Sequence, residues 1–282
     1  MSGLRRAVER QFVRAVSAPW VSRLTGRLAD ARLPRLLLRA AIRAYGRLYR
    51  VDWSEVRDPI GSFKTFNAFF VRRLRAGARP VAGGAGAVTS PCDARLSAWG
   101  QVPGDGRLEQ VKGKTYALEA LLGSTEEAGR FRGGVYATLY LSPGMYHRVH
   151  SPVDGRIRSW RYLPGRLFPV NGLALANVEG LFTRNERVAV FLDTEAFGRV
   201  AVVLVGATNV GRISLAFTDL VTNVGRSALR TEPPAPISIA RGDDLGVFNL
   251  GSTVVLLVAD RSLRPAAAGE RVRMGQALWR RP

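Results

Sequence analysis

The sequence predicts an α+β protein, in which an amphipathic helical N-terminal region precedes a β-rich domain of barrel or sandwich type. Apolar residues recur at helical spacing from residue 4 to about residue 50. After the glycine-rich stretch 83–86, short β-type runs alternate with Gly and Pro turns. With 282 residues, of which 46% are hydrophobic, the chain can bury a substantial core. We expect a helical region over 1–80 and a β-rich domain over 81–282.

The first helical stretch, "LRRAVERQFVRAVSAPW", carries arginines on one side and apolar residues on the other. The apolar residues near one face are Leu4, Val8, Phe12, Val16 and Trp20. "LPRLLLRAAIRAYGRLY" continues the pattern, and "FKTFNAFFVRRLRAGARPV" (63–81) predicts another short amphipathic helix that ends near Gly77–Pro80. A basic amphipathic helix suits a membrane interface. It equally suits a helical hairpin that packs on its own domain, with its arginines merely solvated.

The β-rich domain is predicted from runs of apolar and β-branched residues bounded by turn residues. The runs are "RLSAWG", "GVYATLYL", "GRIRSWRYL", "RVAVFLD", "RVAVVLVGA" and "STVVLLVAD". The last of these is almost wholly apolar, so we expect it to be paired inside the sheet.

The charge balance is strongly basic, with 42 Lys and Arg against 22 Asp and Glu and a formal net charge of +20. Such a surface attracts nucleic acid phosphates or anionic lipid headgroups. High-GC coding bias also enriches arginine without any binding role. Aromatic residues are not interleaved with the basic ones as in RNA-recognition signatures, so nucleic acid is not an expected partner.

Several classes of protein are excluded by what the chain contains. A single cysteine, Cys92, rules out an internal disulfide framework and a Cys-rich metal site. With His147 and His150 as the sole imidazoles, no metal is expected. No apolar run is long enough to span a bilayer, and the N-terminal sequence lacks the features of a secretory signal. We therefore expect an intracellular protein.

The sequence LGST occurs twice, and its two copies have different surroundings. The copy at 122–125 follows a helical stretch, so Gly123 and Ser124 are typical of a helix C-cap and the next N-cap. The copy at 250–253 enters an apolar strand. There Gly251, without a Cβ, allows close approach to its carbonyl, and the hydroxyl of Ser252 could turn back toward it.

Both histidines lie in one short segment, "LYLSPGMYHRVHSPVDG" (139–155). Histidine titrates near neutral pH and suits proton transfer, although a lone histidine is more often structural. A nearby carboxylate would fix its tautomer and stabilise its protonated form. The candidate carboxylates are Asp93 in "SPCD" and Asp154 in "SPVD".

These stretches, in this order, resemble the pyruvoyl-dependent phosphatidylserine decarboxylases over most of the chain. The resemblance rests on "FNAFFVRRLRAGARP", "SPCDARLSAWG", "YALEALLG", "YLSPGMYHRVHSPVDG", "LPGRLFPVN", "LFTRNERV", "VGATNVG" and "GVFNLGSTVV". It implies that the chain is a proenzyme that cuts itself at Gly251–Ser252 into a β chain, 1–251, and an α chain, 252–282. The two chains are expected to stay together as a heterodimer.

The resemblance also assigns the residues of the site. Asp93, His150 and Ser252 are implied as the self-processing triad, and Asp154 ranks well below Asp93. His147 is implied near the decarboxylation step, although the two histidines could exchange roles. Ser252 would become a covalent pyruvoyl group, the self-derived cofactor. A Schiff base between this group and phosphatidylserine would lose carbon dioxide and yield phosphatidylethanolamine.

The implied substrate lies in an anionic membrane, which gives the basic residues a purpose. We expect peripheral attachment at the cytoplasmic side of the cell membrane, with Trp20, Phe69 and Phe70 as apolar anchors. "LPGRLFPVN" (163–171) could form a loop over the headgroup site, whereas Phe168 within it could instead belong to the core. A homo-oligomer is left open.

One rival class of enzyme keeps the same residues. In a hydrolase, Ser252 would act as a turnover nucleophile through an acyl-enzyme, and the chain would remain intact. The state of the 251–252 peptide bond separates the two possibilities.

Overall fold

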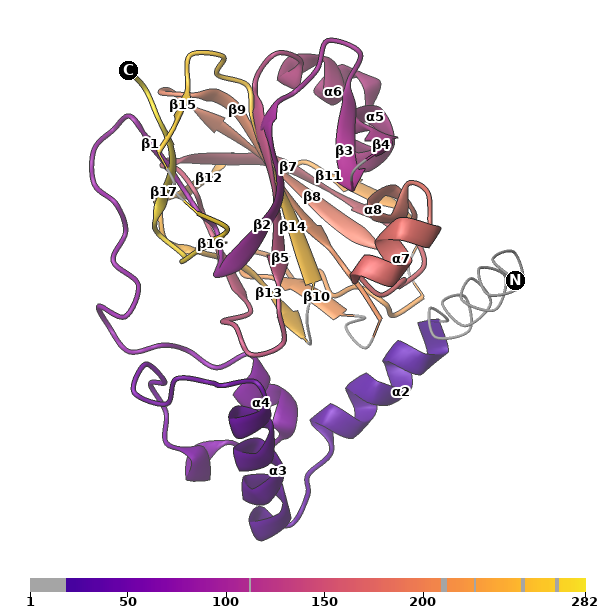
Figure 1. The fold of residues 1–282 in the computed structure, drawn as a ribbon, viewed down its shortest axis with the longest axis vertical. Coiled ribbons are helices and arrows are strands. Elements are labelled where there is room, and N and C mark those ends of the chain that lie inside the picture. The colour runs from indigo at the N-terminus through magenta and orange to yellow at the C-terminus, as the bar shows by residue number, and fades with distance from the viewer. Residues whose placement is uncertain (1–18, 112, 209–211, 226, 250–251, 267–268) are drawn as a thin grey trace.

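A computed structural model of the chain describes residues 19–111, 113–208, 212–225, 227–249, 252–266 and 269–282. The helices of the N-terminal part lie at one end of the molecule, below the sheets in Figure 1. They are α2 (Pro19–Asp30), α3 (Arg35–Leu48), the short 3-10 helix η1 (Ile60–Ser62) and α4 (Phe66–Phe70). The prediction that helices precede the β-rich part is confirmed, with the described helices lying between residues 19 and 70, and the boundary at residue 80 stays a prediction. Residues 1–18 lie outside the described part of the chain.

The prediction of a helix over 63–81 is wrong beyond residue 70, where α4 ends. Thr65 begins α4 by accepting a hydrogen bond from the Ala68 amide at 3.1 Å. The chain then turns away, because its next backbone groups pair with an earlier segment. The Arg57 amide donates to the Arg73 carbonyl at 3.0 Å, and the Arg75 amide donates to the Glu55 carbonyl at 2.8 Å. This pairing replaces the hydrogen bonds that a longer helix would have made.

The largest sheet has nine strands, and neighbouring strands are antiparallel throughout. Its order is β11 (Leu229–Thr231), β7 (Gly155–Leu163), β8 (Arg187–Thr194), β9 (Gly198–Val205), β14 (Ser252–Val258), β5 (Val135–Leu141), β2 (Ala94–Gln101) and β16 (Arg271–Val272), with β12 (Ile237–Ile239) also paired to β7. The six runs predicted as strands all lie in this sheet.

Strand β14 lies in the middle of the sheet, between β9 and β5 (Figure 1). Its side chains alternate between two buried faces, with Val254 and Leu256 on one and Val255 and Leu257 on the other. The prediction that this apolar run is paired inside the sheet is confirmed.

Two layers cover the faces of the large sheet. On the face of Val254 lie two three-stranded sheets, β10 (Arg212–Leu215)–β13 (Asp244–Asn249)–β6 (Arg148–His150) and β1 (Ala87–Thr89)–β17 (Ala277–Arg280)–β15 (Arg264–Pro265). On the face of Val255 lie α5 (Leu118–Leu122), α6 (Thr125–Phe131), α7 (Gly172–Asn177), α8 (Leu181–Arg184) and the hairpin β3 (Arg107–Val111)–β4 (Lys114–Ala117). The α+β class is confirmed, with open, sandwich-like sheets rather than a closed barrel.

The first LGST copy has the capping role that the sequence predicts. Gly123 ends α5 in the left-handed region, with φ 64°. The Ser124 hydroxyl then accepts from the Glu127 amide at 3.3 Å and so begins α6.

Candidate functional site

The candidate site lies where β13 leads toward the second LGST copy. The Phe248 amide donates to the His147 carbonyl at 3.1 Å, and His150 lies opposite Asp244 in the pairing of β6 with β13. Both histidines are therefore held beside the strand that runs into the predicted cleavage segment. Gly251 and the side chain of Ser252 lie outside what the structure describes, whereas the main chain of Ser252 begins β14 opposite Leu141.

His147 is fully buried, with 0% of its surface exposed. Its Nδ1 lies 2.8 Å from the Met145 carbonyl, which can only accept, so Nδ1 carries the proton and Nε2 keeps a lone pair. Nε2 has no hydrogen-bond partner among the described residues. Burial, reinforced by the nearby Arg72 cation and opposed by the Met145 hydrogen bond, lowers the pKa of His147 to about 3. The ring is therefore neutral at physiological pH, and its Nε2 can accept a hydrogen bond.

Residues of the N-terminal region build the surroundings of His147. The ring of Phe70, from α4, lies 4.2 Å from the imidazole centroid to centroid. Arg72 donates from Nη2 to the carbonyls of Gly144 at 3.0 Å and Met145 at 3.4 Å, and so fixes the turn that orients His147.

The expectation that Phe69 and Phe70 anchor a membrane is wrong. Phe69 is 0% exposed and packs with Trp53 and Tyr45, while Phe70 is 2% exposed against His147. A side chain without solvent contact cannot insert into lipid. The helical spacing of the sequence showed that the two rings belong to one helix, but did not show which face that helix buries.

His150, in contrast to His147, is held by both ring nitrogens. Its Nδ1 donates to the Gly242 carbonyl at 2.7 Å, and its Nε2 lies 3.2 Å from the Tyr146 hydroxyl, whose ring stacks on the imidazole. Burial is the largest cause that lowers the pKa of His150, and the Gly242 hydrogen bond and the carboxylate of Asp244 oppose it.

The carboxylate beside His150 is that of Asp244, whose Oδ1 lies 3.7 Å from Nδ1. Arg148 and Arg73 each reach Asp244 Oδ2 at 2.8 Å and hold the carboxylate in place. Burial favours the neutral form of Asp244, but the hydrogen bond from Arg148 and the nearby cations outweigh it, so the pKa of Asp244 is lowered. Asp244 is not among the carboxylates that the sequence pattern singles out. The signal for it is a charged residue at the start of the strand "DLGVFN", but only the register of β13 on β6 places it opposite His150.

Asp93 does not contact His150 in the described conformation, contrary to expectation. Its carboxylate accepts two hydrogen bonds from Arg79, at 2.8 and 2.6 Å, and one from the Met274 amide at 2.9 Å. A bidentate guanidinium binds a carboxylate more strongly than a neutral imidazole does, which accounts for the difference. Met274 belongs to the 252–282 segment, so Asp93 ties the two predicted chains together. Its role in self-processing stays a prediction.

Among the described residues, neither of the two remaining candidates, Asp154 and Phe168, makes a hydrogen bond or ion pair with His147 or His150. Asp154 is largely exposed and pairs with Arg241. Phe168 is buried at 2% exposure, with the Arg184 guanidinium over its ring, so it belongs to the core. The backbone of Phe168 is fixed by Asn185, which accepts from its amide and donates to its carbonyl, both at 2.9 Å.

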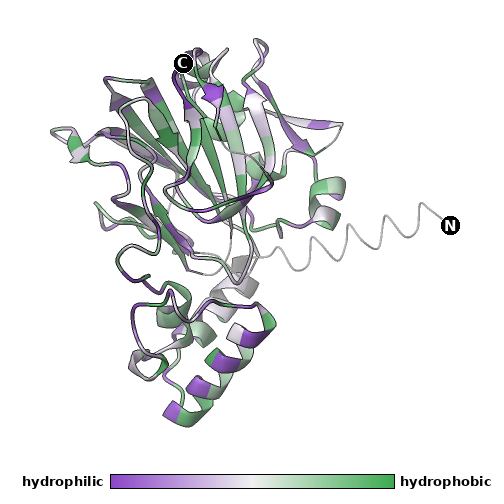
Figure 2. Ribbon diagram, turned by 60° about the vertical axis from the view of Figure 1, so that its left-hand side comes forward, coloured by the Kyte–Doolittle hydropathy of each residue, from purple (hydrophilic) through white to green (hydrophobic). Residues whose placement is uncertain are grey.

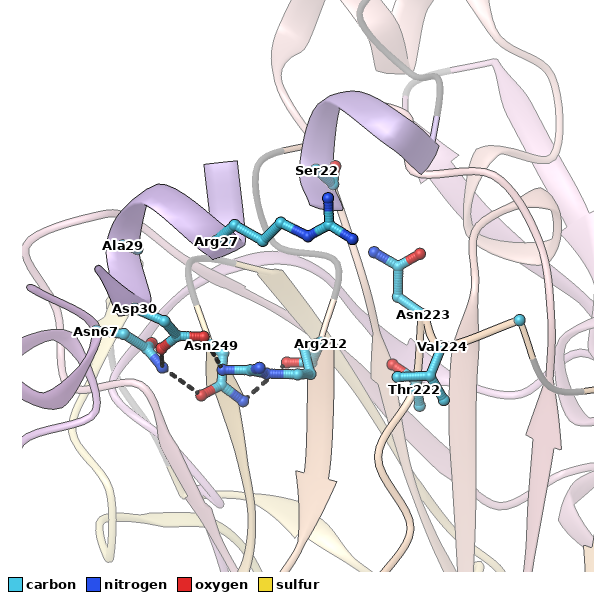
Figure 3. Close-up of a pocket in the computed structure, with 12 residues that line it drawn as sticks. Ser22, Arg27, Ala29, Asp30, Asn67, Arg212, Thr222, Asn223, Val224 and Asn249 are labelled. Atoms are coloured by element: carbon cyan, nitrogen blue, oxygen red, sulfur yellow. Dashed lines mark hydrogen bonds and ion pairs between the residues drawn. The ribbon is translucent and has the colours of Figure 1, made fainter. Parts of the chain in front are cut away.

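A cavity of about 380 Å³ lies between α2 and the ends of β10 and β13 (Figure 3). Arg27, Arg212 and Asn223 are among its lining residues. Asn249, the last described residue before the predicted cleavage segment, also lines it. The cavity therefore offers polar and cationic groups next to the segment in which the reacting serine is expected.

Comparison with known proteins identifies the family. A sequence model described as phosphatidylserine decarboxylase matches residues 66–280. The chain belongs to the phosphatidylserine decarboxylase family. These proteins are carboxy-lyases, so the chain is an enzyme of that class. The match begins at the first residue of α4 and includes both histidines and the second LGST copy.

Individual relatives extend the similarity over almost the whole chain. A protein of Anaeromyxobacter sp. (strain K) is 45% identical, over 92% of this chain and 93% of its own length. One of Vibrio cholerae serotype O1 (strain ATCC 39315 / El Tor Inaba N16961) is 46% identical, over 91% and 92%. One of Brevibacillus brevis is 40% identical, over 92% of both chains. Each is named phosphatidylserine decarboxylase proenzyme.

Proposed function

We propose that this chain converts phosphatidylserine to phosphatidylethanolamine and carbon dioxide, using a pyruvoyl group that it makes from its own Ser252. Membership of the phosphatidylserine decarboxylase family carries the proposal. The relatives' names include the word proenzyme, which supports a chain that matures by cleavage.

The residues present fit such a group. The main chain of Ser252 is paired with Leu141, and Thr253 is paired on both sides, with Tyr140 and Val205. The buried Nε2 of His147 has no hydrogen-bond partner within the described part of the chain. The carbonyl of His147 accepts from the amide of Phe248, which lies four residues before Ser252. The pyruvoyl ketone would supply an electron sink for the carbanion that forms when carbon dioxide leaves.

Self-processing requires a base, because a serine hydroxyl is a weak nucleophile at neutral pH. The Ser252 oxygen attacks the Gly251 carbonyl while its proton passes to a histidine, and an acyl shift from nitrogen to oxygen gives an ester. Elimination releases the Gly251 carboxylate and leaves dehydroalanine at 252, which water converts to the pyruvoyl group and ammonia. We assign the base to His150, whose Nδ1 proton is committed to Gly242, so that Nε2 carries the lone pair. Nε2 lies 3.2 Å from the Tyr146 hydroxyl and must exchange this partner for the Ser252 hydroxyl to take its proton.

His147 has the state needed for the second reaction. The substrate amine arrives as an ammonium and must lose a proton before it can attack a carbonyl. The neutral Nε2 of His147 can accept a hydrogen bond from that ammonium and so orient its nitrogen, while the proton leaves to water, because a ring with a pKa of about 3 is too weak a base to hold it. Arg72 and Phe70 hold the ring in place for this role.

We also propose peripheral attachment to the cytoplasmic face of the cell membrane. Along the helices at this end of the molecule, hydrophobic and hydrophilic residues alternate (Figure 2). Helices α2 and α3 expose five large apolar side chains among their arginines: Leu24, Leu28, Leu36, Leu37 and Leu48. Apolar and basic groups together suit an anionic bilayer surface, where each cation contributes about 1 kcal/mol. None of the described helices is long and apolar enough to cross a bilayer.

The intact mass of the purified protein under denaturing conditions tests the proposal. Wild type should appear as two fragments, 1–251 and 252–282, the second with a blocked N-terminus. Ser252→Ala should remain one inactive chain, whereas Ser124→Ala, in the other LGST copy, should be cut normally because Ser124 only caps α6. An active protein that consists of a single unbroken chain would contradict the proposal and favour the hydrolase.

A further inference from the structure

A closed ring of polar side chains joins α2, α4, β10 and β13 beside the predicted cleavage segment (Figure 3). Asn67 links two of its members, since its Nδ2 donates to Asp30 Oδ1 at 2.8 Å and to Asn249 Oδ1 at 3.0 Å. Arg212 closes the ring. Its Nη2 binds Asp30 Oδ2 at 2.7 Å, and its carbonyl accepts from Asn249 Nδ2 at 3.2 Å.

The position of the ring ties it to the reacting bond. Asn249 is the last residue of β13, and the described chain resumes at Ser252, the first residue of β14. The main chain of β13 is already paired with β10 and β6. The strand therefore does not need the ring to stay in the sheet. The ring instead fixes the side chain of Asn249 at the end of β13, directly before residues 250 and 251.

Asn67 is the buried member of the ring, since it is only 8% exposed, and its amide group donates to both α2 and β13. The side chains of Asp30 and Arg212 are 37% and 38% exposed, so their ion pair contributes little by itself. Asn67 carries the coupling, because one amide group binds both Asp30 and Asn249, and the loss of either partner weakens its hold on the other. Three residues after Asn67, Phe70 packs on His147, so α4 contacts both the ring and the catalytic imidazole.

We propose that Asp30, Asn67, Arg212 and Asn249 form a latch that positions the cleavage segment and makes self-processing depend on the docking of α2. The inference rests on the proposed function, because it concerns the rate of that cleavage. A nucleophile and a carbonyl react fast only when held in line, and a displacement of about 1 Å can cost about 100-fold in rate. The four latch residues are positioning residues, and coupling between α2 and the segment acts in both directions.

A double-mutant cycle on the cleavage rate tests the latch. Full-length Asp30→Ala, Asn249→Ala and the double variant are made by cell-free translation, and cleavage is followed on denaturing gels. Each single change should slow cleavage by about tenfold, and the double change by about tenfold rather than 100-fold, because members of one ring are not independent. Wild-type rates in the single variants, or multiplied effects in the double variant, would overturn the latch.

Two further variants separate positioning from folding. Glu126→Ala removes a carboxylate of α6 that accepts a hydrogen bond from Arg130 at 2.9 Å. Neither residue belongs to the latch, so this variant should be cut at the wild-type rate. Asp30→Asn retains an oxygen for Asn67 but loses the charge that binds Arg212, so cleavage should slow less than in Asp30→Ala. A full rate in Asp30→Ala, or an equal loss in both Asp30 variants, contradicts the latch.

Thermal unfolding in an uncut Ser252→Ala background shows whether each variant is folded at the assay temperature. Failure of the latch is also distinct from failure of the proposed function. If wild type is never cut, the proposed function is wrong. If wild type is cut and Asp30→Ala is cut equally fast, only the latch is wrong.

Discussion

Burial fixes the protonation of His147 and makes the stability of the protein depend on pH. The pKa of His147 is about 3 in the folded chain, against the ordinary value of 6.5. Between these values the unfolded chain binds a proton that the folded chain does not, so the free energy of unfolding falls as the pH falls below about 6.5. His150, whose pKa is also lowered, acts in the same direction.

Replacement of His147 should therefore flatten the acid limb of the stability curve. In an uncut Ser252→Ala background, we expect the His147→Gln variant to lose about 2 kcal/mol less than its parent between pH 7 and pH 5. Urea unfolding at both pH values measures the difference. Equal losses in parent and variant would show that folding does not shift the pKa of His147.

Asp244 should raise the pKa of His150, the proposed base of self-processing. The carboxylate lies 3.7 Å from Nδ1 and stabilises the positive charge that forms when Nε2 takes a proton. In Asp244→Asn the pKa of His150 falls further, so the rise of the cleavage rate with pH should move to lower pH and the maximal rate should decrease. The exposed Asp154→Asn is the matched control and should leave the profile in place. An unchanged profile in Asp244→Asn would remove Asp244 from the mechanism.

The two carboxylates show how far residue-level prediction reached. The sequence identifies the residue types of the site and the segment that carries both histidines. It does not reveal which carboxylate lies beside His150, because Asp93 and Asp244 are both close to candidate motifs. Strand register and competing cations distinguish the two. Arg79 holds Asp93, whereas the pairing of β13 with β6 places Asp244 opposite His150.

At the scale of elements, strands were predicted well because both faces of the main sheet are buried. Runs such as 187–193 and 252–260 are apolar on both sides and bounded by turns, a pattern that long-range contacts do not change. The helix over 63–81 was overextended because the chain after α4 pairs with residues 55–57 instead. That pairing depends on tertiary contact and leaves no trace in helical spacing.

Arg187, at the start of β8, should be a strong stability determinant because it joins two helix ends. Its buried guanidinium donates to the carbonyls of Ala120 and Leu121 at the end of α5, and to those of Thr183 and Asn185 at the end of α8. Burial lowers its pKa to about 10, so the cation remains charged near neutral pH.

We expect Arg187→Met to cost about 3–5 kcal/mol in the free energy of unfolding, because it leaves four carbonyls without a donor. Urea unfolding measures the loss. Arg130→Met, which removes an exposed pair with Glu126, should cost less than about 1 kcal/mol. A similar small loss in both variants would contradict this role for Arg187.

At the scale of the whole molecule, the helical end is expected to meet the membrane while the sheets carry the chemistry. The double variant Leu28→Asp/Leu36→Asp places charges on exposed positions of α2 and α3 without disturbing buried contacts. It should lose most sedimentation with phosphatidylserine vesicles at low salt, whereas Leu229→Asp, exposed on the edge strand β11, should retain it. Equal sedimentation of the two variants would exclude this surface as the contact.

The fold also explains how a cut chain would stay whole. Strand β14 lies between β9 and β5, and Asp93 binds the Met274 amide, so fragment 252–282 is held by the sheet core and by a buried carboxylate. The two fragments should co-elute in native gel filtration and separate only in denaturant. Leu257→Ala, at a fully buried position, should lower the free energy of unfolding by about 2–5 kcal/mol, so its fragments should separate at a lower urea concentration. Arg264→Ala, at an exposed position, should leave that concentration unchanged. Separation of wild-type fragments without denaturant would mean that β14 does not hold the molecule together.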